Sequence, residues 1–177
     1  KLGYVVMFSP FAFILVISFG FNRIAYPMLL FLFLLFSGVM GMSLSFIFQQ
    51  YTAGSIYGTF AAASGMFGLM AVVGYTTKTD LTKFGSIMMM GLIGIIIASI
   101  INWFIGSSTM DYIISFIGVL VFTGLTAYDV QKLKRIGAGV EYGTEMASKL
   151  VIMGALSLYM DFLNLFLFLL RLFGDRK

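Results

Sequence analysis

The chain contains no cysteine and no histidine among its 177 residues, and only 10% of its residues are charged. The absence of cysteine excludes disulfides and thiol chemistry, and the absence of both residue types excludes the usual zinc sites. Without imidazole groups, any response to pH near neutrality has to come from carboxyl groups in unusual surroundings. The sequence also has no phosphate-binding glycine loop, dinucleotide fingerprint or nucleophile triad. These absences leave few enzyme classes open.

Apolar residues, by contrast, make up 60% of the sequence. Soluble domains are about 45–50% apolar and about 25% charged, so the lipid bilayer must be the solvent for most of this chain. The net charge of +4 is spread over short loops, which bears on membrane orientation and does not indicate nucleic acid as a partner. We therefore expect an integral membrane protein, with lipid as its first partner.

Apolar stretches alternate with short polar breaks, and each stretch is long enough to cross a hydrocarbon core of roughly 30 Å as a helix. The long apolar runs lack a period of two, which excludes barrel strands. We predict an all-α membrane protein with one domain over residues 1–177, built as a bundle of six visible helices. These helices are expected at about 4–20, 24–48, 54–76, 85–105, 111–131 and 147–172.

Lysine and arginine gather in every second polar break, which predicts the orientation of the bundle. The first, third and fifth breaks should be cytoplasmic, and we interpret the chain as trimmed, with an odd number of helices missing before Lys1. The cationic tail that follows Arg171 then falls on the outside. Either the charge rule fails at this tail, or the last helix is re-entrant and both its ends face the cytoplasm. The charged residues of the three breaks are Arg23, then Lys78 and Lys83, then Lys132, Lys134 and Arg135.

Small residues recur at three- and four-residue spacing in two of the expected helices, which lets transmembrane helices approach closely. We expect this pattern to reflect tight packing within the bundle, and the alternative is a dimer interface. The residues are Gly54, Gly58, Ala61, Ala62, Gly65 and Gly68, and then Gly91, Gly94 and Ala98.

A single aspartate, Asp161, interrupts the longest apolar run, which extends from residue 150 to residue 170. A carboxylate at membrane depth is costly unless it is paired, neutralised or hydrated, so it marks a functional site by default. Ser157 and Asn164 share its helical face. We expect this polar stripe to face the bundle interior, and the apolar residues on the other sides favour a last helix surrounded by its neighbours.

Asp129, near the end of the fifth apolar stretch, is the best candidate partner for Asp161, and Thr126 and Lys132 share its helical face. The two aspartates lie at one depth only if the last helix is tilted or starts within the cytoplasm. If they meet, they would titrate as a unit. The pair could then act as a proton-controlled latch, or Asp129 and Asp161 could ligate a hard cation such as Ca²⁺. The structural alternative is that Asp129 caps its helix or pairs with Lys132 or Arg135.

Three segments resemble the Bax inhibitor-1 (transmembrane Bax inhibitor motif) family. Residues 155–174, ALSLYMDFLNLFLFLLRLFG, closely resemble its C-terminal signature, and GLTAYDVQKLK at 124–134 resembles its sixth-helix motif. Residues 60–85 look like its third-to-fifth-helix region. The resemblance covers essentially the whole chain and implies a bacterial inner-membrane member with seven helices, of which this chain lacks the first.

The resemblance also implies a last helix enclosed by the other six and an aspartate pair, Asp129 and Asp161, that senses pH. Family members are described as pH-sensitive calcium leak channels, and some bacterial members as modulators of a membrane-bound AAA protease. No resident cofactor is implied, only transient Ca²⁺. The bacterial channel member has a basic residue in its second helix that latches the pair. Arg23 is the local candidate for that latch, although its position in a polar break does not match well.

Three functions compete at this point. The first is a proton-gated cation leak, and the second is a non-conducting subunit or regulator of a larger membrane complex. The third is an intramembrane aspartyl protease, which also needs two membrane aspartates and a Tyr-Asp pair like Tyr128–Asp129. Its second aspartate lies in a Gly-x-Gly-Asp context, whereas Asp161 follows Leu158, Tyr159 and Met160. This difference argues against the protease, so a non-enzymatic role is expected.

Overall fold

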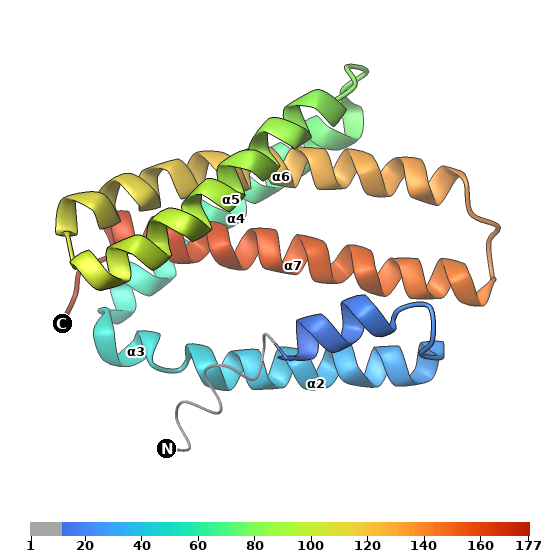
Figure 1. Cartoon of the computed structure of the whole chain (residues 1–177), viewed down its shortest axis with the longest axis horizontal. Coiled ribbons are helices and arrows are strands. Elements are labelled where there is room, and N and C mark those ends of the chain that lie inside the picture. The colour runs from blue at the N-terminus through green and yellow to red at the C-terminus, as the bar shows by residue number, and fades with distance from the viewer. Residues whose placement is uncertain (1–11) are drawn as a thin grey trace.

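The computed structural model describes residues 12–177, which contain helices and no strand beyond the isolated bridge between Tyr51 and Arg176. Part of the first predicted helix, at 4–20, lies outside the described residues, and residues 12–20 are helical. Five spans are long and apolar enough to cross a membrane, with α2 and α3 counted together. The predicted all-α membrane class is therefore confirmed. The helices are α2 (Tyr26–Leu44), α3 (Ile47–Gln50), α4 (Ala53–Thr76), α5 (Thr82–Ile105), α6 (Ser108–Ala138) and α7 (Glu145–Phe173) (Figure 1).

Local side-chain chemistry explains several of the helix ends. The hydroxyl groups of Thr52, Ser107 and Thr144 accept hydrogen bonds from backbone N–H groups in the first turns of α4, α6 and α7, at 3.3, 3.2 and 3.1 Å. Such N-caps satisfy donors that the helix itself leaves free. Helix α5 ends at Ile105 and is followed by Gly106, whose φ of 69° suits a residue without a Cβ atom.

Two predicted helix boundaries were wrong. Helix α6 continues to Ala138 rather than stopping near residue 131, so the basic residues after Asp129 are helical. Side chains of this extension bind the α4–α5 loop, which stabilises the added turns. The stretch predicted as one helix over 24–48 is interrupted between α2 and α3, where the Ser45 hydroxyl donates to the Met42 carbonyl at 2.7 Å. Such local bonds compete with the regular helix pattern.

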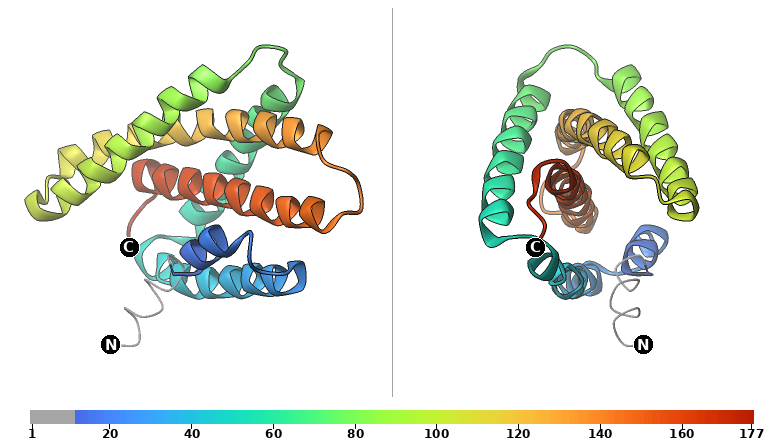
Figure 2. Two further views of the ribbon diagram at one scale, coloured as in Figure 1. Left: turned by 45° about the vertical axis from the view of Figure 1, so that its right-hand side comes forward. Right: turned by 90° about the vertical axis from the view of Figure 1, so that its left-hand side faces the viewer.

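Helices α6 and α7 run antiparallel and are the most buried of the membrane spans (Figure 1). Helix α7 contacts α2, α4 and α6, and helix α6 contacts α4, α5 and α7. Figure 2 shows α4 and α5 on either side of α6, joined across it by the loop of residues 77–81. The outer faces of α4 and α5 expose large apolar side chains, including those of Leu69, Val72 and Ile96, as a lipid environment requires.

The small residues of α4 do not mediate the close helix packing that their spacing predicted. A Cβ atom added at Gly58 or Gly65 would meet nothing within 4 Å, and both glycines are exposed. The close approach occurs instead at Gly74, where a Cβ atom would clash with the carbonyl oxygen of Ala127 in α6. Similarly, a Cβ atom at Gly85 would overlap the Tyr128 ring. The spacing identifies a smooth helical face but does not say whether a neighbour covers it.

The two ends of α7 lie at opposite ends of the bundle. At its start, Glu145 Oε1 accepts a hydrogen bond from the Tyr26 N–H at 3.2 Å. We call this the loop end, because it holds residues 21–25, 77–81 and 139–144. At the tail end, the residues after α7 pair with the α3–α4 junction through the Thr52 N–H and the Asp175 carbonyl, at 3.0 Å.

A continuous helix of 29 residues is about 44 Å long, which is enough to cross a bilayer completely. Helix α7 has no break at which it could turn back, as the re-entrant alternative would need, and the positive charges of the tail lie at the opposite end of the bundle from the other basic breaks. These tail cations have local partners. Arg171 lies 3.7 Å from Asp111, and the Lys177 ammonium donates to the Phe48 carbonyl at 2.9 Å.

Candidate functional site

Asp161 is buried in the middle of α7, with 5% of its surface exposed. Its Oδ2 atom is buried and has no hydrogen-bond donor among the described residues. The ion pairs found within residues 12–177 are Arg135–Asp80 and Arg171–Asp111, so neither involves Asp161. A carboxyl group in such surroundings is costly unless another group or a proton compensates for lost hydration.

The register of α6 against α7 brings Asp129 to this position. Gly118 of α6 lies against the Phe168 ring, and Leu133 lies against Gly154, so the level of Asp161 falls between these two contacts. Asp129 lies about one turn nearer the loop end. Side chains lean toward the N-terminus of their own helix, and in antiparallel helices this leaning makes the two carboxyl groups converge. The Asp129 carboxyl lies within hydrogen-bonding reach of Asp161.

Because α6 and α7 are long, Asp129 and Asp161 do not lie at the different membrane depths that the sequence suggested. Helix α6 continues for about 14 Å beyond Asp129, and α7 begins about 24 Å before Asp161. Because Lys132 lies within α6, it does not mark the end of that helix. Both aspartates can therefore occupy one interior layer without a short or strongly tilted last helix.

Asp161 is buried and Asp129 is half-buried, and a shared proton is one arrangement that satisfies both carboxyl groups. When the pair holds a single proton, one group becomes an O–H donor and the other stays an acceptor. That proton would supply the donor that Asp161 Oδ2 otherwise lacks. With no proton, two negative charges would face each other. One shared proton would therefore let a hydrogen bond join α6 to α7, whereas two ionised carboxylates have no donor between them.

The polar residues predicted to support the aspartate pair differ in how deeply they are buried. Thr126 is fully buried, and its hydroxyl donates to the Phe122 carbonyl at 2.8 Å. Asn164 is half-buried and donates to the Met160 carbonyl at 2.8 Å. Ser157 is exposed, so the expected continuous interior stripe is wrong at this position. The neighbours that cover Asp161 do not extend over the preceding turn on that side.

The basic residues considered as partners of the aspartates lie elsewhere. Arg23 is exposed in the turn before α2, close to the start of α7 and about 24 Å of helix from Asp161, so it does not latch the pair here. Lys132 is exposed, and Arg135 pairs with Asp80 rather than with Asp129. The structural alternative of a pairing between Asp129 and these cations is not what residues 12–177 show.

The described residues contain no cluster of three or more acidic, histidine or cysteine side chains that could hold a metal ion. Asp129, Asp161 and the Thr126 hydroxyl together offer fewer oxygen ligands than the six to eight that Ca²⁺ usually takes. The arrangement therefore suits brief contact with a passing cation better than a tight resident site.

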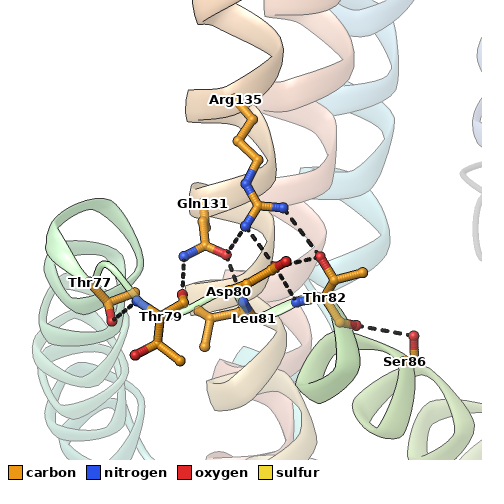
Figure 3. A network of polar contacts seen from close by, with 8 residues as sticks. All are labelled: Thr77, Thr79, Asp80, Leu81, Thr82, Ser86, Gln131 and Arg135. Carbon is orange, nitrogen blue, oxygen red and sulfur yellow. Dashed lines mark hydrogen bonds and ion pairs between the residues drawn. The ribbon is translucent and has the colours of Figure 1, made fainter.

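A polar network that the sequence analysis missed fixes α6 from the side away from α7 (Figure 3). Gln131 is 7% exposed, and its side-chain amide both donates to and accepts from the backbone of the α4–α5 loop. Its Nε2 donates to the Thr79 carbonyl at 2.7 Å, and its Oε1 accepts from the Leu81 N–H at 2.9 Å. This loop is thereby anchored to α6 two residues after Asp129.

Arg135 completes the network one turn further along α6 (Figure 3). Its guanidinium donates to Asp80 Oδ1 at 2.7 Å, to Gln131 Oε1 at 2.9 Å and to the Thr82 hydroxyl at 3.2 Å. The four-residue spacing of Gln131 and Arg135, with an acidic residue between two threonines in the polar break, was the available signal. We call Asp80, Thr82, Gln131 and Arg135 the loop clamp.

Two variants of the loop clamp should differ in how their thermal stability depends on pH. Hydrogen bonds from Thr82, and then from Arg135, lower the pKa of Asp80 from its ordinary value of 3.8. A lowered pKa means that ionised Asp80 stabilises the fold at neutral pH and that this contribution is lost as pH falls below about 4. Arg135→Gln should lower Tm by about 1–2 °C at pH 7, because the pair is exposed, and the difference should fade in acid.

Gln131→Leu is the matched variant, since it removes the buried amide that holds the Thr79 carbonyl and the Leu81 N–H of the loop. It should lower Tm by roughly 5–10 °C at every pH where the protein stays folded. Thermal unfolding in detergent, followed at several pH values, measures both variants. Equal losses for the two variants, or a Gln131→Leu loss that disappears in acid, would contradict the roles assigned to these side chains.

Comparison with known proteins agrees with these observations. The family model for inhibitors of apoptosis-promoting Bax1 matches residues 1–177. The inner membrane protein YbhL of Escherichia coli K12 is 45% identical over 173 residues, which are 97% of this chain and 74% of that relative. A protein of Borreliella burgdorferi is 48% identical over 94% of this chain and 72% of its own length. Protein RP147 of Rickettsia prowazekii is 44% identical over 99% of this chain and 74% of its own length.

None of these relatives' names carries an enzymatic activity. The name of the Escherichia coli relative and the five apolar spans together indicate an integral protein of the bacterial inner membrane. The matched family model covers the whole chain, and the relatives match nearly all of it. The chain therefore belongs to the Bax inhibitor-1 family.

Proposed function

We propose that this protein is a pH-sensitive cation leak, with Ca²⁺ as the conducted ion, and that Asp129 and Asp161 form its gate. In a seven-helix bundle, the last helix would be enclosed by the other six. No covalent chemistry and no bound cofactor are needed for this role. The observation that carries the proposal is the buried Asp161 carboxyl, which has one unsatisfied oxygen and the Asp129 carboxyl as its neighbour.

The gate would work through the proton of the pair. In the one-proton state, an O–H···O⁻ bond joins α6 to α7 and keeps the path closed. Loss of the proton breaks this bond and places two negative charges where a cation can be attracted. The loop clamp holds α6 to the α4–α5 loop, so α7 would be the helix that moves.

A cavity beside the pair supports this division of roles. It has a volume of about 540 Å³, lies between α6 and α7 toward the loop end, and is mostly apolar. Of its lining residues, Leu133 lies one turn from Asp129 along α6, and Leu158 lies one turn from Asp161 along α7. This space would let α7 shift against α6, and it would give ions a route to the pair from the loop end.

The direct test is Ca²⁺ entry into liposomes that contain the purified protein and a trapped fluorescent indicator. The flux should change at least several-fold as pH is varied on both sides of the membrane, relative to protein-free liposomes. Glu141→Gln, which removes an exposed carboxylate from the 139–144 loop, is the control and should behave like the wild type. Flux that equals the protein-free background at every pH would contradict the leak.

A second candidate is a non-conducting subunit or regulator of a larger complex, such as a membrane-bound AAA protease. The exposed small-residue face of α4 favours it, because a Cβ atom added at Gly54, Gly58, Gly65 or Gly68 would meet nothing within 4 Å among residues 12–177. Reconstitution with such a protease separates the two functions. A change in the rate of substrate degradation, with no Ca²⁺ flux, would favour the regulator over the leak.

A further inference from the structure

A second cavity lies at the tail end, remote from the aspartate pair. Its volume is about 250 Å³, and it is lined by polar and apolar atoms in similar measure. The polar lining includes the charged side chains of Asp111, Arg171 and Arg176, while Leu167 and Leu170 of α7 contribute apolar surface. The cavity is smaller than the roughly 300–1,000 Å³ of typical drug or cofactor pockets, so it suits a small charged group.

The two arginines at this cavity are positioned by the surrounding structure. Arg171 lies over the Phe168 ring at 5.6 Å and 3.7 Å from Asp111, which leaves other guanidinium N–H groups free to donate. Arg176 lies over the Tyr51 ring at 5.8 Å.

The backbone next to Arg176 is also held in place. The Lys177 N–H donates to the Gln50 carbonyl at 2.8 Å, and the Asp175 N–H donates to the Ser55 hydroxyl at 2.8 Å. A guanidinium held in this way loses less freedom when it binds an anion.

Aromatic side chains indicate that this end of the bundle lies at a membrane–water interface. Trp103 and Phe104, in the last turn of α5, are 83% and 81% exposed, and Tyr112, in the first turn of α6, is 60% exposed. Tryptophan and tyrosine favour the level of the lipid headgroups. The charged cavity, which includes Asp111 from the same turn of α6, therefore opens where phosphates of the bilayer are found.

We propose that this cavity binds the headgroup of phosphatidylethanolamine from the surrounding leaflet. Arg171 and Arg176 would donate to the phosphate oxygens, because guanidinium groups recognise phosphate with charge-assisted hydrogen bonds. The Asp111 carboxylate would accept from the ammonium group. Two cationic groups and one anionic group thus match a headgroup with an anionic and a cationic end, and the apolar lining would face the lipid tails. This proposal does not depend on ion conduction.

Native mass spectrometry of the purified protein, titrated with phosphatidylethanolamine or phosphatidylglycerol of matched chains, tests the proposal. The wild type should retain phosphatidylethanolamine in preference to phosphatidylglycerol. The double variant Arg171→Gln/Arg176→Gln should bind both lipids at least about tenfold more weakly. Asp111→Asn should lose the preference while still binding phosphatidylglycerol.

The matched control is Lys78→Gln/Lys83→Gln, which removes two cations from the loop end and should bind like the wild type. Size-exclusion profiles and Tm values confirm that each variant is folded, and Arg171→Lys/Arg176→Lys should keep part of the affinity if the first double variant is unstable. Equal lipid binding by the wild type and both arginine variants would overturn the site. Binding of free glycerophosphoethanolamine as tight as that of the lipid would overturn the assignment to the membrane.

Discussion

We expect Asp161→Asn to remove the pH dependence of the proposed Ca²⁺ flux and to hold this flux at least about tenfold below the wild-type maximum. The asparagine amide donates a hydrogen bond to the Asp129 carboxylate that no change of pH removes. The contact between α6 and α7 is then permanent, and the site has lost one of its two acidic groups. The interaction energy of two unit charges 4 Å apart, in surroundings of intermediate dielectric, is about 4 kcal/mol. This energy exceeds the change in barrier that corresponds to a tenfold change in rate, so the tenfold reduction is a lower bound.

The measurement is indicator-monitored Ca²⁺ entry into liposomes, with wild type, Asp161→Asn and Asp129→Asn at equal protein density. Asp129→Asn should give the same flat profile, because either amide can supply the permanent donor. Asn164→Ala is a useful control, since Asn164 lies on the same helical face but bonds only to its own helix backbone at Met160. Flux of Asp161→Asn that follows the wild-type profile with pH would contradict the gate.

We expect Gly74→Ala to destabilise the protein strongly and Gly65→Ala, on the same helix, not to destabilise it. The added methyl group at Gly74 would overlap the carbonyl oxygen and Cα of Ala127, and backbone atoms in α6 cannot rotate away as a side chain can. Overpacking of this kind costs about 1–3 kcal/mol or more. At Gly65 the methyl group meets nothing within 4 Å, and alanine favours a helix over glycine by about 0.5–1 kcal/mol.

Thermal unfolding in detergent, followed by size-exclusion chromatography, measures this pair of variants. Gly74→Ala should lower Tm by about 5 °C or more, and Gly65→Ala should leave it unchanged or raise it slightly. If Gly65→Ala is as harmful as Gly74→Ala, the small-residue face of α4 is packed against a partner in the protein as purified. That result would contradict the prediction that this face is free in the purified protein and would favour an oligomer.

The acidic residues could be identified from sequence because a membrane interior makes each of them costly. Asp161 stands alone in an apolar run, and few other acidic residues lie near enough to the interior to meet it. The same reasoning predicted a helical membrane protein. The side of each helix that packs against a neighbour could not be predicted in this way. Gly58 and Gly74 have the same local sequence character, yet only Gly74 meets a neighbour, because that choice is made by tertiary contacts.

The extent of α6 was the other feature beyond reach of the sequence. A run of lysines and arginines is typical of a loop at the membrane surface, and it led to a predicted helix end near residue 131. The added turns are stabilised by bonds from Gln131 and Arg135 to a loop about fifty residues earlier in the chain. The predicted burial of Ser157 was wrong for a related reason. Helical spacing defines a face of the helix but not the length over which neighbours cover that face.

The most direct measurement is infrared spectroscopy of the carboxyl groups in the membrane-reconstituted protein across the pH range. The account predicts one protonated carboxyl group that is present near neutral pH in the wild type and absent from both Asp129→Asn and Asp161→Asn. A wild type with no protonated carboxyl band near neutral pH would show that these side chains hold no common proton. The same conclusion would follow from a band that survives in both variants.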